Sequence, residues 1–415
     1  ADKIREHALD YKDKVEIKED LVRDIKKHVD CFTIFTESEK EYESKTILFA
    51  TGTKWRKLPM KGALEYESKG VHYCALCLPK DESIIVNSSI KKIKDITPLT
   101  RVLKINGTYK EIGGFMKRNY KGNLIKIKPR FFSEPVLLTP NHPVYTLKCI
   151  RRINGKYKIS FTKPDWKEAR ALREGDCVLY PVIKETKDIN YVKISDFIEV
   201  KKLKNDYVTP LYPTKTSNKI KDKISINKDF LRLVGYYLAE GSAHKHQLRF
   251  YFNKNEKDYI KDVKQLLKKI FNLKVDLRIV NNVCHMGIYS KVLSDLFKLL
   301  FGNYSFNKNL PHWIMILPKE KQKEVIKGMW GGDGCLREKD FCYVTSSRGL
   351  AYQLRDLLLR RGIICGLQKR DKRGLNRWQN RIEGRLVGFD HDKYHVVVGG
   401  QFLENMAKLL NKDHP

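Results

Sequence analysis

The chain has 415 residues, of which 41% are hydrophobic, so it can build several folded cores and is not disordered as a whole. Its 82 Lys and Arg side chains against 49 Asp and Glu give a net charge of +33. Residues 1–76 hold fifteen basic and fifteen acidic side chains, so the whole excess lies in 77–415. This charge predicts a polyanionic partner for the second part, and no apolar run is long enough to span a bilayer. Nine scattered cysteines and the lack of a signal peptide favour a reducing cytoplasm.

The first 76 residues have the pattern of a small piece of an α/β protein. Residues 1–30 alternate charged and apolar side chains at roughly helical spacing, and residues 31–36 and 46–50 are predicted to be strands. The second strand runs into Thr51-Gly52-Thr53, where glycine lets backbone approach a ligand closely. A C-x-x-C motif follows at Cys74 and Cys77.

The stretches TILFATGTKWRKLPMKG and GVHYCALC together resemble the thioredoxin reductase family. The resemblance implies an α/β flavoprotein whose A-T-G segment closes over FAD and whose C-x-x-C forms the redox disulfide. The dinucleotide fingerprint G-x-G-x-x-G does not occur in residues 1–76, so we expect a host fragment that does not bind FAD by itself. By this resemblance the host FAD segment holds Ala50, Thr51 and Gly52, and the host redox cysteine is Cys74.

A different pattern starts at Cys77, and residues 77–185 have short apolar runs separated by turns, which predicts a mostly-β domain. Cys77 at the junction, the T-x-x-H of Thr139 and His142, and the run LREGDCVLYPV resemble the N-terminal splicing blocks and Hint-type fold of an intein. In that reading the Cys77 thiol attacks the carbonyl of Leu76, while Thr139 and His142 polarise the bond and supply a proton. The simpler alternatives are that Cys77 belongs to a redox pair and that His142 is an ordinary turn histidine.

The C-terminal splicing signal of an intein is a His-Asn pair, whose Asn cyclises. The sequence ends in Asp413-His414-Pro415, and proline has no side-chain amide to attack the backbone. We therefore expect this stretch to lack the C-terminal splicing blocks, as a fragment incomplete at both ends.

After a predicted linker at 186–225, residues 226–415 contain an internal duplication. Aligning Gly235 with Gly328 also aligns Glu240 with Asp333. Each motif is followed by the same predicted order, so the unit α-β-β-α-β-β-α occurs twice, over about 226–305 and 306–415.

Glycine in a helix costs about 1 kcal/mol relative to alanine, so the glycines of both motifs predict two helices that cross closely. That crossing would bring Glu240 and Asp333 together as ligands for Mg²⁺ in phosphodiester hydrolysis. LVGYYLAEG and IKGMWGGDG resemble the motifs of LAGLIDADG (DOD-type) homing endonucleases, and NKNLPHWIMILP resembles a block in which Lys308 is the basic residue near the active site. The simpler alternatives are solvated helix ends for the acids and a surface lysine for Lys308.

The fold class predicted for the whole chain is multidomain α+β: a partial α/β flavoprotein fragment, a mostly-β Hint-type domain and a duplicated αββαββα endonuclease. The predicted function is a Mg²⁺-dependent endonuclease acting on double-stranded DNA, monomeric with internal pseudo-twofold symmetry. The alternatives are a thioredoxin-disulfide reductase, which is the activity of the host, and a DNA-binding module with a decayed nuclease. Strands of the duplicated part are predicted to bring six basic side chains to DNA: Arg249, Lys274, Arg278, Lys369, Arg370 and Arg373.

Overall fold

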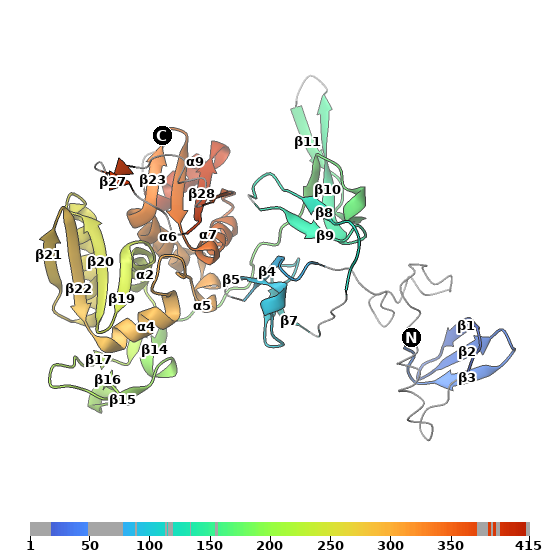
Figure 1. The fold of residues 1–415 in the computed structure, drawn as a ribbon, viewed down its shortest axis with the longest axis horizontal. Coiled ribbons are helices and arrows are strands. Elements are labelled where there is room, and N and C mark those ends of the chain that lie inside the picture. The colour runs from blue at the N-terminus through green and yellow to red at the C-terminus, as the bar shows by residue number, and fades with distance from the viewer. Residues whose placement is uncertain are drawn as a thin grey trace. The chain divides into compact units, whose positions relative to one another are not determined.

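The computed structural model describes residues 18–48, 78–87, 89–112, 114, 119–132, 134–153, 157–371, 381–382, 385–386 and 391–411 (Figure 1). The chain divides into two compact units, Ala1–Leu76 and Cys77–Pro415, at the junction where the sequence predicts the flavoprotein fragment to end. Within the described ranges, no helix combines the length and the apolar character needed to cross a membrane.

The described part of the first unit is an antiparallel meander of β1 (Val22–Lys27), β2 (Phe32–Thr36) and β3 (Glu41–Ser44). The strand predicted at 31–36 is confirmed. The helical spacing of residues 1–30 is misleading over β1, because cross-strand pairing with β2 outweighs local pattern there. Residues 46–48 form no strand, and Leu48 is exposed. The candidate residues Ala50, Thr51, Gly52, Cys74 and Cys77 lie outside the described residues.

The second unit begins with a strand-rich region, as the turn pattern predicts. One sheet has the order β5-β4-β6-β7, and the long strand β10 pairs with β11, β12 and β13. β8 and β9 form a separate pair. The strands are β4 (Ser83–Val86), β5 (Ser89–Lys92), β6 (Arg101–Leu103), β7 (Tyr109–Glu111), β8 (Ile125–Ile127), β9 (Val136–Leu138), β10 (Pro143–Ile153), β11 (Tyr157–Phe161), β12 (Asp165–Glu168) and β13 (Asp176–Val178).

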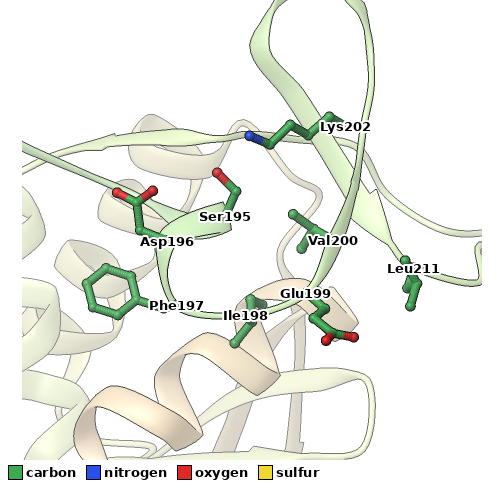
Figure 2. A pocket seen from close by; sticks show the side chains of 8 residues that line it. All are labelled: Ser195, Asp196, Phe197, Ile198, Glu199, Val200, Lys202 and Leu211. Atoms are coloured by element: carbon green, nitrogen blue, oxygen red, sulfur yellow. The ribbon is translucent and has the colours of Figure 1, made fainter.

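The stretch 186–225, predicted as a linker, is folded. It forms two small antiparallel sheets, and its isoleucines 194, 220 and 224 are buried in the main core of the second unit. The Lys-rich composition hides this, because the lysines alternate with the buried positions. A surface pocket of about 430 Å³ lies here, and no predicted site residue lines it. Figure 2 shows its lining side chains, those of residues 195–200, Lys202 and Leu211. The strands are β14 (Tyr191–Lys193), β15 (Val200–Lys202), β16 (Tyr207–Pro210), β17 (Ile220–Lys221) and β18 (Lys223–Ser225).

The predicted duplication is confirmed in its elements and in its sheet topology. The first repeat has a sheet of order β19-β20-β22-β21, and the second has the matching order β23-β24-β28-β25. The first repeat comprises α2 (Lys228–Glu240), β19 (Gly241–His244), β20 (Gln247–Asn253), α3 (Lys257–Phe271), β21 (Asp276–Val280), β22 (Val283–Tyr289) and α4 (Lys291–Phe301). The second comprises α6 (Lys319–Asp333), β23 (Gly334–Arg337), β24 (Asp340–Thr345), α7 (Arg348–Arg360), β25 (Gly366–Arg370), β28 (Lys393–Gly399) and α9 (Leu403–Leu410).

Two elements stand outside this symmetry. The short α5 (His312–Met315) precedes α6, and a small hairpin of β26 (Arg381–Ile382) and β27 (Arg385–Leu386) is inserted before β28. Figure 1 shows α2 and α6 between the two four-stranded sheets. Alternate residues of each sheet face these helices and build the core: in β20 these are Leu248, Phe250 and Phe252. The opposite sheet faces are left for other partners.

Candidate functional site

The site is organised by the close crossing of α2 and α6. A Cβ added to Gly235 would lie 2.3 Å from the carbonyl oxygen of Val325 and 2.7 Å from the Cα of Gly328. A Cβ on Gly328 would lie 2.2 Å from the carbonyl oxygen of Arg232. The two backbones therefore touch where only glycine fits, which explains why each helix tolerates a residue that weakens it.

The crossing brings the C-terminal ends of both helices together. Glu240 is the last residue of α2, and Asp333 is the last residue of α6. A Cβ on Gly332, the residue before Asp333, would lie only 2.8 Å from the Cγ of Glu240, so the structure brings the two acids close together.

The glycines that follow the acids do not end the helices in a left-handed conformation. Gly241 (φ −91°) and Gly334 (φ −89°) are extended and start β19 and β23. They are glycines because a Cβ would lie 2.3 Å from the Tyr237 ring in one case and 2.1 Å from the Trp330 ring in the other. Each acid therefore stands at a sharp change from helix to strand.

The surroundings of the acids disfavour their charged forms. Burial, then repulsion from Asp333 and Glu256, raises the pKa of Glu240 to about 8. Crowding by protein atoms raises the pKa of Asp333 to about 7, although Lys393, Lys308 and the Tyr343 hydroxyl oppose the rise. The Asp333 side chain is nevertheless exposed to water, which screens its charge, so we expect a smaller rise at Asp333 than at Glu240. A cation bound between them would stabilise their charged forms and so lower both pKa values.

Lys308 lies in the same site and is not a surface lysine, since only 3% of it is exposed. Its Nζ donates hydrogen bonds to the carbonyl oxygens of Tyr237 and Gly241, each at 2.6 Å, and lies 3.6 Å from the centre of the Tyr237 ring. Burial lowers the pKa of Lys308 to about 7, although Asp333 and Glu240 act in the opposite direction. The ammonium group therefore sits where α2 ends, close to both carboxyl groups.

Two further residues of the site escaped the sequence analysis. Lys393 in β28 is close enough to lower the pKa of Asp333, and its Nζ donates to the Ser346 hydroxyl at 2.8 Å. Tyr343 in β24 is fully buried, and its hydroxyl also acts on Asp333. Tyr343 could have been found from the alternation of Phe341, Tyr343 and Thr345, whereas nothing near Lys393 in the sequence signals its role.

The outer face of the first sheet gathers two of the predicted DNA contacts. Arg249 in β20 and Arg278 in β21 line one shallow hollow with Tyr251, His285 and other residues. Gly287 lies opposite Arg249 in β22 and leaves room for the arginine side chain. Lys274 is exposed but precedes β21, so it lies beside the sheet and outside any strand.

The second sheet places its predicted contacts on different faces. Arg370 pairs with Lys393 and is exposed. Lys369 lies on the same face of β25 as buried Leu367, and its Nζ forms ion pairs of 3.1 Å with Asp371 and Asp392. The structure therefore does not bring Lys369 to the outer face, because strand alternation turns it to the opposite side. Arg373 lies outside the described residues.

The predicted splicing residues Thr139 and His142 stand together in a tight turn between β9 and β10. The His142 N–H donates to the Thr139 carbonyl oxygen at 2.9 Å. The Thr139 hydroxyl and the His142 Nδ1 are buried, and neither has a hydrogen-bond partner among the described residues. Burial lowers the pKa of His142 below its ordinary value, which favours the neutral ring.

Comparison with known proteins identifies one domain. Residues 320–411, which run from α6 to α9, match the sequence model of the LAGLIDADG-like domain. A solved complex of I-DmoI with DNA and Mn is similar at 14% identity, with 46% of this chain and 99% of that chain covered and a TM-score of 0.33.

Curated relatives match the chain in different proportions. Uncharacterized protein MJ0043 of Methanocaldococcus jannaschii is 32% identical over 74% of this chain and 41% of its own length. The ATP-dependent DNA helicase Hel308 of Thermococcus kodakarensis is 25% identical over 71% of this chain but 28% of its own length. Thioredoxin reductase of Ureaplasma parvum is 31% identical over 25% of this chain and 31% of its own length. The chain thus spans less than half the length of these relatives.

Proposed function

We propose that the second unit carries a metal-dependent, site-specific endonuclease for double-stranded DNA, borne by an intein that interrupts a thioredoxin reductase-like protein. One observation carries the nuclease proposal: two acids from equivalent positions of a duplication meet at a helix crossing beside a buried lysine. The LAGLIDADG-like domain over 320–411 and the charge of the second unit support the choice of DNA as substrate.

The donor set of the site fits a divalent cation. Glu240 and Asp333 have raised pKa values, and a bound cation would stabilise their charged forms. The described residues contain no group of three or more His, Cys, Asp and Glu side chains suited to a metal. Mg²⁺ suits such a site, because it commonly takes one or two carboxylates and fills its shell with water and phosphate oxygens. When bound there, the cation supplies activation of water and stabilisation of the leaving oxygen.

The remaining groups hold charge and position the substrate. Lys308 and Lys393 place positive charge beside the carboxylates, where charge develops on the scissile phosphate. With a pKa of about 7, Lys308 can exchange its proton near neutral pH. Arg249, Arg278 and Arg370 would contact the duplex, with Lys274 beside the first sheet, and Arg373 is a further predicted DNA contact. Each repeat would then bind one half of the DNA target, which suits a monomer with internal pseudo-twofold symmetry.

For splicing, we propose that the Sγ of Cys77 attacks the carbonyl carbon of Leu76. The thioester bond forms as the Leu76–Cys77 amide bond breaks, and neutral His142 takes the proton that the Cys77 thiol loses and passes it to the freed Cys77 nitrogen. The unsatisfied Thr139 hydroxyl and His142 Nδ1 support this role, because buried polar groups without partners need a reason. A helicase matching most of this chain and a reductase matching a quarter of it support an element inserted in unrelated hosts.

The plasmid that tests the nuclease carries an uninterrupted thioredoxin reductase gene across its C-x-x-C codons. We expect the full chain to cut it with Mg²⁺, and not to cut a copy already interrupted there, because an insertion splits its own target. Asp333→Asn should keep DNA binding but lower cleavage by roughly 100-fold or more, as charge stabilisation at the reacting phosphate is lost. Glu338→Gln, which changes an exposed acid in the β23–β24 turn, is the matched control. Full cleavage by Asp333→Asn would leave the acids as structural helix ends.

A further inference from the structure

An exposed aromatic cluster includes two rings of the loop that precedes Lys308. The rings of Tyr304 and Phe306 are stacked, with centres 5.6 Å apart and planes 2° apart. The ring of His391 lies 4.4 Å from that of Phe306. Tyr304 is 60% exposed and Phe306 is 44% exposed, so this stack is presented to solvent and not buried in the core.

The loop that carries the two rings is pinned by its own hydrogen bonds. The Asn307 side-chain oxygen accepts the N–H groups of Asn303 and Tyr304, at 3.0 and 2.8 Å. Gly302 (φ +77°) packs so tightly on the Asn307 carbonyl that a Cβ would lie 2.3 Å away. The rings are therefore ordered before any ligand arrives, which lowers the entropy lost on binding.

The cluster is linked to the proposed catalytic centre through two segments of the chain. Phe306 precedes Lys308 by two residues, and His391 precedes Lys393 by two residues. The Asn303 side-chain oxygen accepts the Ala243 N–H at 2.7 Å, which ties the loop to β19 just past Glu240. These links place the rings on segments that also carry the two lysines of the proposed site.

We propose that Tyr304, Phe306 and His391 form an aromatic wedge that enters the duplex between the two cleavage positions and unstacks a base step. The proposal rests on the nuclease function proposed above. Apolar and aromatic side chains that open a base step bend the duplex and bring more of it onto the protein. Ring faces also stack on any base, so the wedge contributes affinity without reading sequence. A basic surface that exposes ordered rings at its catalytic centre is suited to this partner.

The test uses the full chain and a duplex of the uninterrupted reductase gene across its C-x-x-C codons. The fluorescent base 2-aminopurine replaces, one at a time, adenines between the two nicks of the wild type. With Ca²⁺ in place of Mg²⁺, we expect binding to raise the fluorescence at one step, because unstacking relieves quenching. The double variant Tyr304→Ala/Phe306→Ala, which removes both rings and leaves no large apolar side chain, should lose most of this rise and bind roughly ten-fold more weakly, the loss of about one stacked base. Tyr304→Phe, which keeps the ring, should retain the rise.

The control is Tyr212→Leu, which removes an aromatic ring that is 87% exposed in the region of β16. It should leave the fluorescence and affinity unchanged. If the wild type binds and cuts but no position brightens, or the double variant brightens equally, the wedge is wrong while the nuclease stands. If the wild type neither binds nor cuts the duplex, the proposed function fails, and the wedge fails with it.

Discussion

Burial disfavours the charged forms of both Glu240 and Lys308. Because one is an acid and the other a base, their effects on stability change with pH in opposite directions. The pKa of Glu240 is raised to about 8 by burial and by neighbouring acids, and that of Lys308 is lowered to about 7 by burial. Each group binds protons differently in the folded and unfolded chain, so each makes the free energy of unfolding depend on pH. The signs differ: Glu240 binds more protons when folded, and Lys308 binds more when unfolded.

We predict a minimum in the stability of the metal-free protein near pH 7 to 8. The stabilisation by protonated Glu240 is fully present below its ordinary pKa near 4.5 and is lost as pH rises through about 8. The slope for this one group is at most about 1.4 kcal/mol per pH unit. Between about pH 7, the pKa of folded Lys308, and its ordinary value of 10.5, the unfolded chain binds more protons at this lysine than the folded chain. The free energy of unfolding therefore rises with pH over this range. Urea unfolding across this range, with chelator present, measures the curve.

The same two residues supply the controls. Glu240→Gln should reduce the fall in the free energy of unfolding as pH rises towards 8. Lys308→Met should reduce the increase in that free energy above pH 7. Mg²⁺ should stabilise the wild type more at pH 8 than at pH 6, because the ligands must be deprotonated to bind it. Curves of wild type and Glu240→Gln that run parallel from pH 5 to 8 would show that this carboxyl is freely hydrated.

At this scale the sequence predicted that Glu240, Asp333 and Lys308 lie near one another, which the structure shows, but it did not predict the other residues around them. Register matching of two motifs brings Glu240 and Asp333 to one point without any knowledge of the sheets. Lys393 reaches Asp333 only through the pairing of β28 with β24, a long-range contact that leaves no local signal. Lys369 was expected on the outer face, but a shift of one residue along a strand reverses the face.

At the scale of elements, the fold depends on how closely α2 and α6 approach. Gly235 and Gly328 touch through their backbones, so either helix is displaced if a side chain is added. Packed interiors absorb little extra volume, and a displaced crossing would also separate Glu240 from Asp333.

We predict that Gly328→Ala lowers the free energy of unfolding by roughly 1–3 kcal/mol, although alanine is the better helix former. The new Cβ would stand 2.2 Å from the Arg232 carbonyl oxygen and 2.8 Å from the Tyr236 nitrogen. Cleavage should fall further than stability, because the carboxyl groups move apart. Urea denaturation and plasmid cleavage of the same preparation measure both.

Gly366→Ala is the matched control, since a Cβ there meets only the Val397 carbonyl oxygen at 3.9 Å. It should leave unfolding and cleavage almost unchanged. If Gly328→Ala were as harmless as Gly366→Ala, the helices would not be in backbone contact.

Most elements of the duplication follow from sequence pattern, because amphipathic helices and alternating strands carry their periodicity locally. The strands of 186–225 could not be predicted in this way, because the buried isoleucines are spaced among lysines in strands of only two to four residues. The strand β1 was missed for a related reason: its partner β2, not its own pattern, makes it a strand.

At the scale of the whole molecule, charge separates the two units. Residues 1–76 are neutral, and the second unit carries all of the +33. Phosphate neutralisation releases counterions, so DNA affinity that arises from this charge must weaken with salt.

We predict that residues 77–415 bind duplex DNA and lose roughly 1000-fold in affinity between about 50 and 200 mM salt, if about six phosphates are neutralised. Residues 1–76, expressed as the other compact unit, should not bind. Fluorescence anisotropy of a labelled duplex measures both. Equal affinity of the two units at 150 mM salt would contradict the assignment of DNA binding to the second unit.

The two units meet at the peptide bond on which the proposed splicing chemistry acts, since the first ends at Leu76 and the second begins at Cys77. If Cys77 forms a thioester there, an added small thiol such as dithiothreitol should exchange with it and release residues 1–76. This reaction needs no C-terminal splicing block, because only the first acyl shift takes part. Thr139 and His142 are expected to control its rate through their unsatisfied polar atoms.

We therefore predict that dithiothreitol cleaves the chain between Leu76 and Cys77, with the two products identified by mass spectrometry. Cys77→Ala should abolish the cleavage, because no other nucleophile can form the thioester. His142→Ala should slow it by roughly 100-fold or more, since proton delivery to the leaving nitrogen is lost. The control Cys177→Ala changes a partly exposed thiol of the same strand-rich region and should leave the rate unchanged. Cleavage that persists in Cys77→Ala would show that no thioester at Cys77 is involved. Cleavage at full rate in His142→Ala would leave His142 as an ordinary turn histidine.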